Sequence, residues 1–532
     1  MAANYIQNFN PTTGENLGYY QIASQKEVDT AMAYAREAWH QWKEISLAKR
    51  SQVIANVRKE LTENMGELVD TVCTDTGKVR QEALMADIYP TLELVKYYEN
   101  NITKVLSAEK RATPLSAIGN VSWVEYHSRG VVAVISPWNY PLQLALVPVI
   151  TAVAAGNAVL LKPSEITPLT GEKIKELLAG VPDFPLNLVQ VLQGNGIVGQ
   201  RIIKAEPDMI FFTGSVSTGK KIMSAAAEKL IPVELELGGK DPFIVLEDAN
   251  LERTVNGAIY GAFANTGQLC VSAERIYVQE SILDDFICKA KEKTSQLKVN
   301  QGFWGDIGPF THPEQKKHVT KQIHEALDQG AKIVNHDVQK IKQQLSSSGK
   351  AGELGDRLDN QLEPIILSNV NHAMDIMFSE TFGPVMPIMS FSSDEEAITL
   401  ANSSRYGLNA SVWSRDINRA KYIASRLETG NCMINDVLRN VGNPYLPFGG
   451  VKQSGLGRYH GPEGLRNFSH IKSIMHNKSQ RTRELNWFPF SKEMHQSITE
   501  FLTSYFRDRW IVAKMAKVSV LFLQMLRKIS NK

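Results

Sequence analysis

Features of extracellular and metal-binding proteins are scarce in this 532-residue sequence. It has four cysteines (Cys73, Cys270, Cys288 and Cys432), with no Cys-x-x-Cys pair and no spacing that suits a disulfide framework or a zinc site. Its first ten residues are polar and contain no apolar segment of the kind found in a secretory signal. We therefore expect a cytoplasmic protein, in a reducing compartment, without a bound metal.

An excess of one charge and long apolar runs are also lacking. The 58 Lys and Arg residues nearly balance the 56 Asp and Glu residues, and the formal net charge is +2. Nucleic-acid-binding domains are usually much more basic. In the C-terminal region the densest apolar run, Val518–Leu523, has six residues, whereas a membrane-spanning helix needs about 20. We therefore expect no nucleic-acid partner and no transmembrane helix.

The sequence does contain short apolar segments that alternate with helical ones. Ser24 and Glu27 form a capping box at the start of a predicted helix, Ser24–Trp42, and a second helical run covers roughly Ala48–Thr74. Four continuous apolar strands are predicted further along the chain, with an apolar helix, Leu142–Ala155, after the first: Val131–Ile135, Ala158–Leu161, Leu188–Leu192 and Met209–Phe212. Such strands, separated by helices, predict a parallel sheet covered on both faces.

A second α/β set follows. Its expected strands are Phe243–Leu246, Arg275–Val278, Glu363–Leu367, Ala410–Trp413 and Asn431–Asn435. Between them, Val338–Asn360 is polar and rich in Ser and Gly, which indicates a surface insertion. The sequence therefore predicts an α/β protein of more than one domain.

Ligands of parallel sheets bind at the carboxyl ends of the strands, where three segments of the first set carry polar groups. Asn139, between two prolines, has an amide donor suited to an oxyanion, although it could equally be a capping residue in an aromatic turn. Lys162 and Glu165 could bind the two hydroxyls of an adenosine ribose, and Glu165 would repel a 2′-phosphate. The segment Thr213–Gly219 is a Gly-bounded turn into a helix, where backbone N–H groups could hold a pyrophosphate. Alone it is weak evidence, because it lacks the G-x-G-x-x-G pattern.

Two further residues suggest nucleophilic catalysis. Cys270 follows an apolar stretch, and Glu236 stands before two glycines at the end of a strand. A thiol and a carboxylate could form and then hydrolyse an acyl-thioester. Each residue also has a simpler interpretation: a buried cysteine is usually inert, and an isolated glutamate is usually a surface ion-pair partner.

Seven motifs occur in one order: PWNYP, KPSE, FTGSVSTG, ELGGK, GQLC, SETFGP and NPYLPFGG. This combination resembles the aldehyde dehydrogenase superfamily from about Asn10 to His470. The separation of 34 residues between Glu236 and Cys270 also matches that family. The resemblance implies an aldehyde dehydrogenase fold with a Rossmann-like cofactor domain (1–106 and 126–240), a catalytic α/β domain (241–440) and a bridging β-arm (107–125 and 455–473). Residues 479–532 would form an amphipathic tail.

The resemblance also implies a role for each matching residue. Cys270 would attack the aldehyde, Asn139 and the backbone N–H of Cys270 would hold the oxyanion, and Glu236 would activate the water that hydrolyses the thioester. The cofactor would be NAD, with NADP as the alternative. The expected cofactor-binding residues are Trp138, Lys162, Glu165, Gly214, Ser215, Gly219, Glu380 and Phe382. A homodimer or homotetramer is expected.

Motifs that distinguish subfamilies are mixed. Asn8–Gly18 resembles the tetrameric cytosolic and betaine-type enzymes, whereas Ile434–Val437 and the segment from Tyr459 to His470 resemble class 3 and fatty aldehyde dehydrogenases. Tyr459 replaces a glutamate that many of the former enzymes carry, so Glu236 must release its proton by another path. Acyl transfer to CoA or phosphate, and a non-catalytic role like that of lens crystallins, are the competing functions. The presence of both Cys270 and Glu236 favours hydrolysis.

The segment Phe501–Lys532 combines basic and apolar residues. Lys514, Lys517, Gln524 and Lys528 share one helical stripe, and apolar side chains cover the remainder. This pattern favours a basic amphipathic helix in a membrane interface, and the alternatives are packing on a partner subunit or over the substrate entrance. Together with the fatty aldehyde resemblance, it leads us to expect a medium- to long-chain aliphatic aldehyde, delivered at the membrane surface.

Overall fold

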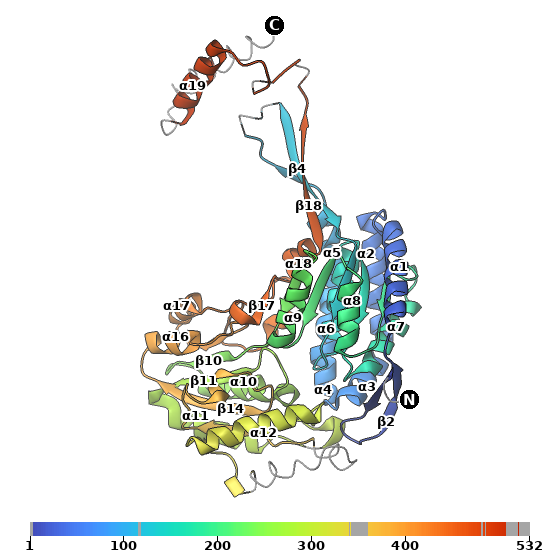
Figure 1. The fold of residues 1–532 in the computed structure, drawn as a ribbon. Helices are drawn as coiled ribbons and strands as arrows, with labels where there is room; N and C mark the ends of the chain where they lie inside the picture. The colour runs from blue at the N-terminus through green and yellow to red at the C-terminus, as the bar shows by residue number, and fades with distance from the viewer. Residues whose placement is uncertain are drawn as a thin grey trace. The chain divides into compact units, whose positions relative to one another are not determined.

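A computed structural model describes residues 4–114, 117, 119–299, 301–339, 341, 360–479, 482–484, 486–506 and 520. The chain divides into two compact units, one of Met1–Ser107 with Tyr126–Ile471 and one of Ala108–Glu125 with Lys472–Lys532. The first unit holds two large sheets and their helices (Figure 1). Both sheets predicted from the sequence are therefore present, and they belong to one compact unit.

The N-terminal region is a hairpin followed by a group of helices. Strands β1 (Tyr5–Phe9) and β2 (Asn16–Gln21) are antiparallel. The predicted capping box begins α1 (Gln25–Trp42): the Ser24 N–H donates to Glu27 at 2.7 Å, and the Glu27 N–H donates to the Ser24 hydroxyl at 3.3 Å. The predicted run from Ala48 is in fact two helices. These two helices are α2 (Leu47–Glu63) and α3 (Met65–Thr76). They are followed by α4 (Arg80–Glu82), a π-helical turn (Ala83–Ile88) and α5 (Tyr89–Leu106).

The first large sheet has the strand order β17-β9-β8-β5-β6-β7. The four predicted apolar strands are present as β5 (Val131–Ile135), β6 (Ala158–Lys162), β7 (Val189–Val191) and β8 (Met209–Thr213), and β9 (Val233–Glu236) follows. These five strands are parallel. Every residue of β5, β6 and β8 is buried, as continuous apolar strands require. The connecting helices are α6 (Gln143–Ala154), α7 (Pro168–Gly180), α8 (Gly196–Lys204) and α9 (Val216–Ala227).

The predicted second arm segment, 455–473, begins within the first compact unit. Strand β17 (Gly455–Leu456) pairs with β9 in antiparallel register, with Gly455 opposite Glu236, and thus forms the edge of the first large sheet. Helix α18 (Gly461–Asn467) follows within the same compact unit. The second arm strand, β18, is Ser469–Asn477. A two-residue strand has too few positions for a hydrophobic pattern to reveal it.

The second large sheet has the order β12-β13-β14-β11-β10-β15-β16 and is parallel except at β12. Its strands are β10 (Asp241–Val245), β11 (Ala273–Gln279), β12 (Lys332–Ile333), β13 (Ile365–Ser368), β14 (Val385–Phe391), β15 (Ser411–Trp413) and β16 (Met433–Ile434). The helices are α10 (Leu251–Phe263), α11 (Leu283–Ser295), α12 (Pro313–Asp328), α15 (Asp375–Phe378), α16 (Asp394–Asn402) and α17 (Ile417–Arg426). Short 3₁₀ turns occur at Ala264–Gly267, Glu280–Ile282, Gly302–Trp304, Arg439–Gly442 and Lys452–Ser454. Most of the predicted insertion Val338–Asn360 lies outside the described residues.

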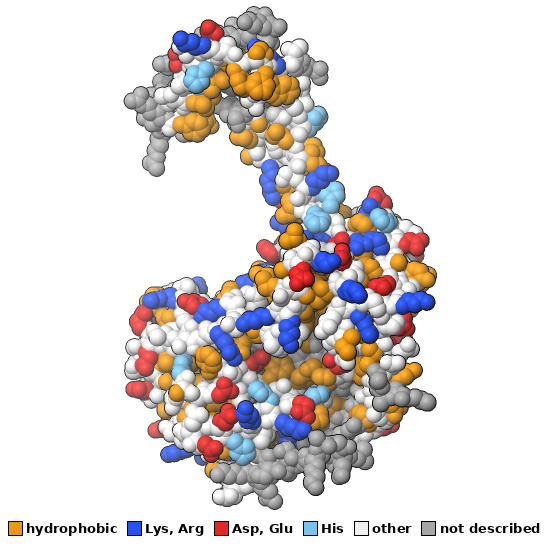
Figure 2. All heavy atoms as spheres, viewed as in Figure 1, with side chains coloured by type: hydrophobic (Ala, Val, Ile, Leu, Met, Phe, Trp, Pro, Cys, Tyr) orange, Lys and Arg blue, Asp and Glu red, His pale blue; other side chains and the backbone are white. Residues whose placement is uncertain are grey.

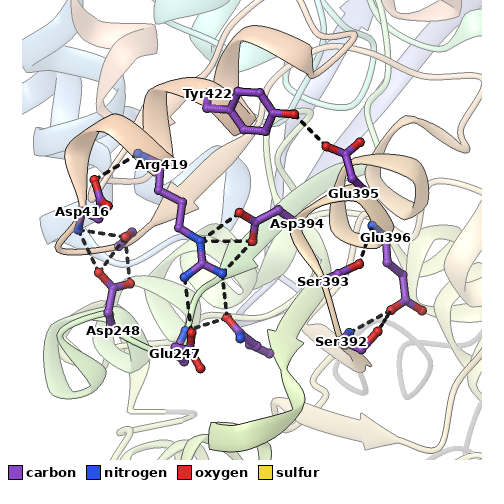
Figure 3. A network of polar contacts seen from close by, with 12 residues as sticks. Glu247, Asp248, Ser392, Ser393, Asp394, Glu395, Glu396, Asp416, Arg419 and Tyr422 are labelled. Atoms are coloured by element: carbon purple, nitrogen blue, oxygen red, sulfur yellow. Dashed lines mark hydrogen bonds and ion pairs between the residues drawn. The ribbon is translucent and has the colours of Figure 1, made fainter.

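A polar network joins α16 and α17 to the end of β10 (Figure 3). The Arg419 guanidinium of α17 donates to both carboxylate oxygens of Asp394, at 2.7 and 2.9 Å, and to Glu247 at 3.4 Å. The Ser414 hydroxyl donates to Asp248 at 2.7 Å. Because a bidentate Arg–carboxylate pair fixes both distance and orientation, this network holds the two helices against the sheet.

The second unit contains a three-stranded sheet and a helix. The sheet has the order β18-β4-β3, with β3 at Glu109–Arg111 and β4 at Asn120–Ser128, and the helix is α19 (Lys492–Phe506). Several large apolar side chains in this unit are exposed: Met475, Trp487, Phe488, Phe490, Leu502 and Phe506. Hydrophobic side chains gather around α19 (Figure 2). No helix within the described part of the chain is long and apolar enough to cross a membrane. The basic stripe predicted at Lys514, Lys517, Gln524 and Lys528 lies outside the described residues.

Candidate active site

Two cavities of the first unit meet at Cys270. The smaller has a volume of about 200 Å³ and is lined by Asn139, Glu236 and Cys270 among others. The larger, of about 920 Å³, is lined mostly by apolar and aromatic side chains. Cys270 and Leu144 are the two lining residues that the cavities share. A thiol in this position can react with a molecule that enters through one cavity while a second molecule occupies the other.

The loop before Cys270 has an unusual backbone. Asn265, Thr266 and Gly267 have φ angles of 48°, 60° and 71°, in the left-handed region that L-residues rarely adopt. The side-chain amide of Gln268 donates to the Asn265 carbonyl at 2.9 Å, and a Cβ at Gly267 would lie 2.1 Å from the carbonyl oxygen of Gly383. These contacts hold the loop in one conformation and fix the position of the thiol.

Asn139 is hydrogen-bonded to this loop. Its side-chain amide donates to the carbonyl oxygen of Gln268 at 3.0 Å. The Lys78 ammonium donates to the Asn139 carbonyl at 2.8 Å and to the buried carboxylate of Asp87 at 2.6 Å. Asp87 also accepts hydrogen bonds from the backbone N–H groups of Leu142 and Gln143, at 3.2 and 3.3 Å. A buried ion pair therefore positions the segment that carries the predicted oxyanion donor.

The environment of Cys270 keeps its thiol neutral at rest. Burial, together with the charges of Glu380, Asp241 and Glu236, raises the pKa of this thiol far above its usual value. Because the thiolate is the nucleophilic form, a base must take the proton when the sulfur attacks. Glu236 and Glu380 line the same cavity, and each is a carboxylate, a group that can take such a proton.

Glu236 is the last residue of β9 and is buried. Neither of its carboxylate oxygens has a hydrogen-bond partner among the described residues. Burial, and secondarily the charge of Glu234, raises the pKa of Glu236 well above 4.5, while Arg458 opposes this shift. A carboxylate that is poorly solvated and without a partner is a stronger base than an exposed one, as proton abstraction from water requires.

Opposite Cys270, a loop carrying Glu380 and Phe382 closes the smaller cavity. Two N–H groups of this loop donate to the Glu274 carboxylate: that of Thr381 at 2.7 Å and that of Phe382 at 2.9 Å. The Lys240 ammonium pairs with the same carboxylate at 2.6 Å. Burial raises the pKa of Glu380 to about 8. The loop is thus anchored to β11 through Glu274.

Close backbone approach shapes the floor of this cavity. A Cβ at Gly238 would lie 2.3 Å from a carboxylate oxygen of Glu380, and one at Gly239 would lie 2.2 Å from the Cys270 carbonyl. The rings of Trp138 and Phe382 meet edge to face, with centroids 5.5 Å apart. Any side chain at either glycine would displace Glu380 or Cys270. The two glycines of ELGGK are therefore required by packing.

The predicted ribose and pyrophosphate residues extend the site along the first sheet. At the end of β6, the Lys162 ammonium lies 3.2 Å from Glu165, whose side chain is 41% exposed. The Ser215 hydroxyl caps α9 by accepting the Thr218 N–H at 3.3 Å, so the start of this helix faces the cavity that Ser215 lines. Helix N-termini bind anions through free N–H groups and the helix dipole. These features fit a dinucleotide.

Eight of the eleven predicted site residues line the smaller cavity: Trp138, Asn139, Gly214, Ser215, Glu236, Cys270, Glu380 and Phe382. The other three lie elsewhere. Lys162 and Glu165 contact each other beside β6, and Gly219 faces Leu237, where a Cβ would lie 2.7 Å from that side chain. Sequence reasoning missed the positioning residues Lys78, Asp87, Lys240 and Glu274. No group of His, Cys, Asp or Glu within the described residues could hold a metal ion.

The order of the motifs and this geometry agree with one protein family. The model of the aldehyde dehydrogenase family matches residues 1–474 of the chain. The chain belongs to the aldehyde dehydrogenase family. The resemblance inferred from the seven motifs is thereby confirmed at the level of the family, the fold and the activity on aldehydes.

Relatives cover nearly the whole chain. A 4,4′-diapolycopene aldehyde oxidase of Methylomonas sp is 43% identical over 498 residues, which is 93% of this chain and 90% of that protein. A betaine aldehyde dehydrogenase of Bacillus subtilis (strain 168) is 35% identical, over 90% of this chain and 95% of that protein.

Solved structures share the same fold. A betaine aldehyde dehydrogenase of Staphylococcus aureus in complex with NAD+ has a TM-score of 0.82 at 31% identity, over 92% of this chain and 94% of that one. An aldehyde dehydrogenase of Mycobacterium tuberculosis complexed with NAD+ has a TM-score of 0.80 at 31% identity, over 89% of this chain and 95% of that one. The predicted aldehyde dehydrogenase fold is therefore confirmed.

Proposed function

We propose that this aldehyde dehydrogenase forms an acyl-thioester on Cys270 and hydrolyses it with water activated by Glu236. The Cys270 sulfur attacks the aldehyde carbon, and its proton is taken by Glu236. The Asn139 amide and the backbone N–H of Cys270 stabilise the oxyanion. Loss of the hydride from this adduct gives the thioester, and Glu236 releases the thiol proton before water attacks. Water then attacks the thioester while Glu236 accepts one of its protons. The leaving sulfur takes up the proton of the new acid, so the carboxylate departs and the thiol is restored. The observation that carries this proposal is the shared cavity in which Cys270, Asn139 and the partnerless carboxylate of Glu236 lie together.

The cofactor is NAD, as predicted, and when bound it accepts the hydride. Glu380, Phe382 and Trp138 would hold the nicotinamide ribose end, and the start of α9 with Gly214 and Ser215 would bind the pyrophosphate. Lys162 and Glu165 would bind the adenosine ribose. A carboxylate at Glu165 favours NAD over NADP, because its charge opposes a 2′-phosphate.

We further propose a long apolar aldehyde as the substrate. The larger cavity, of about 920 Å³, lies at the upper end of the range of about 300–1,000 Å³ that is typical of ligand pockets. Its walls include Tyr89, Tyr140, Tyr260, Met433 and Tyr445. A small cationic aldehyde would fill only part of this space. Medium- to long-chain aliphatic aldehydes, the prediction from the fatty-aldehyde-like motifs, match both its size and its apolar character.

A second candidate is a long polyene aldehyde. It is favoured by the relative named as a 4,4′-diapolycopene aldehyde oxidase, which is 43% identical. Aromatic walls suit a flat conjugated chain, since aromatic side chains pack against planar π-systems. The betaine aldehyde dehydrogenase relative, at 35% identity, supplies the contrasting substrate for a test.

The deciding experiment compares kcat/KM for acetaldehyde, decanal, hexadecanal, a C30 polyene aldehyde and betaine aldehyde with NAD. Each buried methylene contributes about 0.8 kcal/mol, so kcat/KM should rise roughly fourfold per methylene until the cavity is filled. A preference for betaine aldehyde or acetaldehyde would contradict the substrate proposal. NADH formation without CoA or phosphate supports hydrolysis, and dependence on either would contradict the role of Glu236.

The proposed partners are a membrane surface and other copies of this chain. The exposed Trp487, Phe488 and Phe490 beside α19 suit an interfacial position, where aromatic rings contact both lipid and headgroups. Strand β18 carries exposed Ile471 and Met475 at the edge of its sheet. Exposed sheet edges pair with other chains, which supports a bridging arm in a homodimer or homotetramer.

A further inference from the structure

Behind Glu236 lies a second buried carboxylate that the mechanism above does not use. Glu234 is two residues earlier on β9 and is fully buried. Side chains two residues apart on a strand point to the same face of a sheet, about 6.6 Å apart along it. The parallel register with β8 places Phe211 beside Glu234 and Thr213 beside Glu236. The two carboxylates are therefore neighbours on one face, at a spacing similar to that of two groups joined through one water molecule.

The residues around Glu234 leave space for its side chain and give it one hydrogen-bond partner. Gly457, with a φ of 95°, lies against it: a Cβ there would be 2.9 Å from the Glu234 Cγ. One Glu234 oxygen accepts a hydrogen bond from the Asn467 amide, and the other has no partner among the described residues. Unsatisfied buried carboxylate oxygens are costly unless they serve a purpose or bind water.

On the side away from Glu236, the residues next to Glu234 are in contact with solvent. Asn467, Arg129 and Arg458 are all partly exposed. The Arg129 guanidinium donates to the Asn467 carbonyl at 2.9 Å. Burial raises the pKa of Glu234 well above 4.5, and the hydrogen bond from Asn467 and the charges of Arg129 and Arg458 oppose this shift. Glu234 thus has Glu236 on one side and a partly hydrated, positively charged group on the other.

The neighbouring titratable groups are unsuited to carry a proton. His460 is fully buried, and burial lowers its pKa to about 3, so its ring stays neutral. Tyr459 contacts Phe211, and burial followed by the charge of Glu236 raises its pKa well above 10. Burial likewise raises the pKa of Tyr98. A guanidinium group is not a proton carrier in proteins. Glu380 and His318 line the cavity side of Glu236. On the strand side, among the described residues, Glu234 is the group that can both accept and release a proton.

We propose that Glu234 receives the proton that Glu236 takes from the attacking water and releases it beside Asn467. The proposal rests on the function proposed above for Glu236. Overall, RCHO, NAD+ and H₂O give RCOO⁻, NADH and two protons, so protons must leave a buried site in every turnover. The water proton moves to Glu236, the Glu234 proton leaves to solvent, and the Glu236 proton then moves to Glu234. Both carboxylates return to their initial state, and Glu234 acts as a positioning and relay residue that does not touch the substrate.

Glu234→Gln tests this relay, because glutamine keeps the size and an acceptor for Asn467 but cannot titrate. The pre-steady-state NADH burst should persist, while kcat falls at least tenfold on its high-pH plateau. A purely electrostatic role predicts a different profile: removing the charge of Glu234 would lower the pKa of Glu236, which moves the acid limb to lower pH and leaves the plateau unchanged. That result, or a lost burst in a folded protein, would overturn the relay.

Two further measurements keep the test decisive. Glu234→Asp, which retains a titratable group, should recover part of the lost plateau rate. Asp75→Asn is the matched control, since Asp75 is also fully buried but lies outside the site, and its plateau should stay within about twofold of the wild type. If Glu234→Gln does not fold, kcat of the wild-type enzyme is measured in mixtures of H₂O and D₂O. A curved dependence of kcat on deuterium fraction supports two moving protons, and a linear one overturns the relay. Loss of hydrolysis in Glu236→Gln tests the proposed function separately.

Discussion

The side-chain amide of Asn139 donates a hydrogen bond to the carbonyl oxygen of Gln268, 3.0 Å away and two residues before Cys270. An amide group has two N–H donors, so one is held by the loop of the nucleophile and the other stays available for an oxyanion. The proposed oxyanion donor and the proposed nucleophile are thus positioned relative to each other before substrate binds. Such preorganisation is a main source of catalytic power.

The two proposed catalytic residues should fail at different steps. Cys270→Ala should abolish dehydrogenase activity, because no thioester can form. Glu236→Gln should retain an NADH burst and then stall as an acyl-enzyme, since the amide cannot take a proton from water. Stopped-flow absorbance at 340 nm and intact-protein mass spectrometry measure the burst and the acyl adduct. Normal turnover by Cys270→Ala would refute the mechanism.

The dependence of kcat on pH should reflect the burial of Glu236. Burial raises its pKa well above 4.5, and only the ionised form can act as a base. We therefore expect kcat to fall as the pH is lowered through this raised pKa, well above the pH at which an exposed glutamate titrates. A kcat profile under saturating NAD and aldehyde measures this. An acid limb near pH 4.5 would show that Glu236 is more solvated than its burial indicates.

Cofactor preference should depend on Glu165. Its charge opposes a 2′-phosphate, and with a side chain that is 41% exposed the repulsion is on the order of 1–3 kcal/mol. NAD should have the higher kcat/KM, and Glu165→Gln should narrow the gap by raising the value for NADP. As a control, the wild-type enzyme is assayed at high salt, which shows how far ionic screening alone narrows the gap in kcat/KM between NAD and NADP. A preference for NADP in the wild type would disprove this prediction.

Breaking the Lys78–Asp87 pair should cost stability and activity together. Both side chains are almost fully buried, and Lys78→Met leaves an uncompensated buried carboxylate, at a cost of about 3–5 kcal/mol. The Asn139 carbonyl also loses the charged one of its two donors and keeps only the Asn265 amide at 3.1 Å, so kcat should fall. Urea unfolding and steady-state kinetics measure the two effects. The double variant Lys78→Met, Asp87→Asn removes the buried charge and keeps an acceptor for the Leu142 and Gln143 N–H groups, so it should recover much of the stability. Equal losses of stability in the single and double variants would contradict an uncompensated charge.

Removal of the tail should separate membrane binding from catalysis. A chain truncated after Arg483 lacks the exposed Phe488 and all of α19, and it should stay active on short aldehydes. It should no longer co-sediment with vesicles of anionic lipid at low salt. Neutral vesicles provide the control for apolar binding alone. If the full-length protein never co-sediments, the membrane proposal is wrong.

The sequence predicted four strands of the first sheet, β5 to β8, to within a residue at each end. Strands such as Val131–Ile135 and Met209–Thr213 are apolar throughout, because helices cover both faces. The capping box at Ser24 was equally clear, since its hydrogen bonds are local. Where structure depends on neighbours in the chain or on complete burial, the sequence is sufficient.

Other features depend on contacts between distant segments and leave little trace in the sequence. Lys78, Asp87 and Glu274 are charged residues whose burial follows from partners far along the chain, whereas charged residues are usually expected at the surface. Strand β17 is defined by its pairing with β9 and by only two residues. The positive φ angles of Asn265 and Thr266 depend on the packing of the loop. Motif resemblance located the cavity residues, but not the residues that hold them.

The separation of the two cavities, which share only Leu144 and Cys270 among their lining residues, has a kinetic consequence. An aldehyde analogue that fills the larger cavity leaves the nucleotide side accessible, so it should be a competitive inhibitor towards aldehyde and not towards NAD. Reduced nucleotide can likewise depart while the acyl group is still attached to sulfur. In the proposed mechanism, NADH can therefore dissociate from the acyl-enzyme before water attacks. The rates at which NADH and the acid leave the enzyme are then independent of each other.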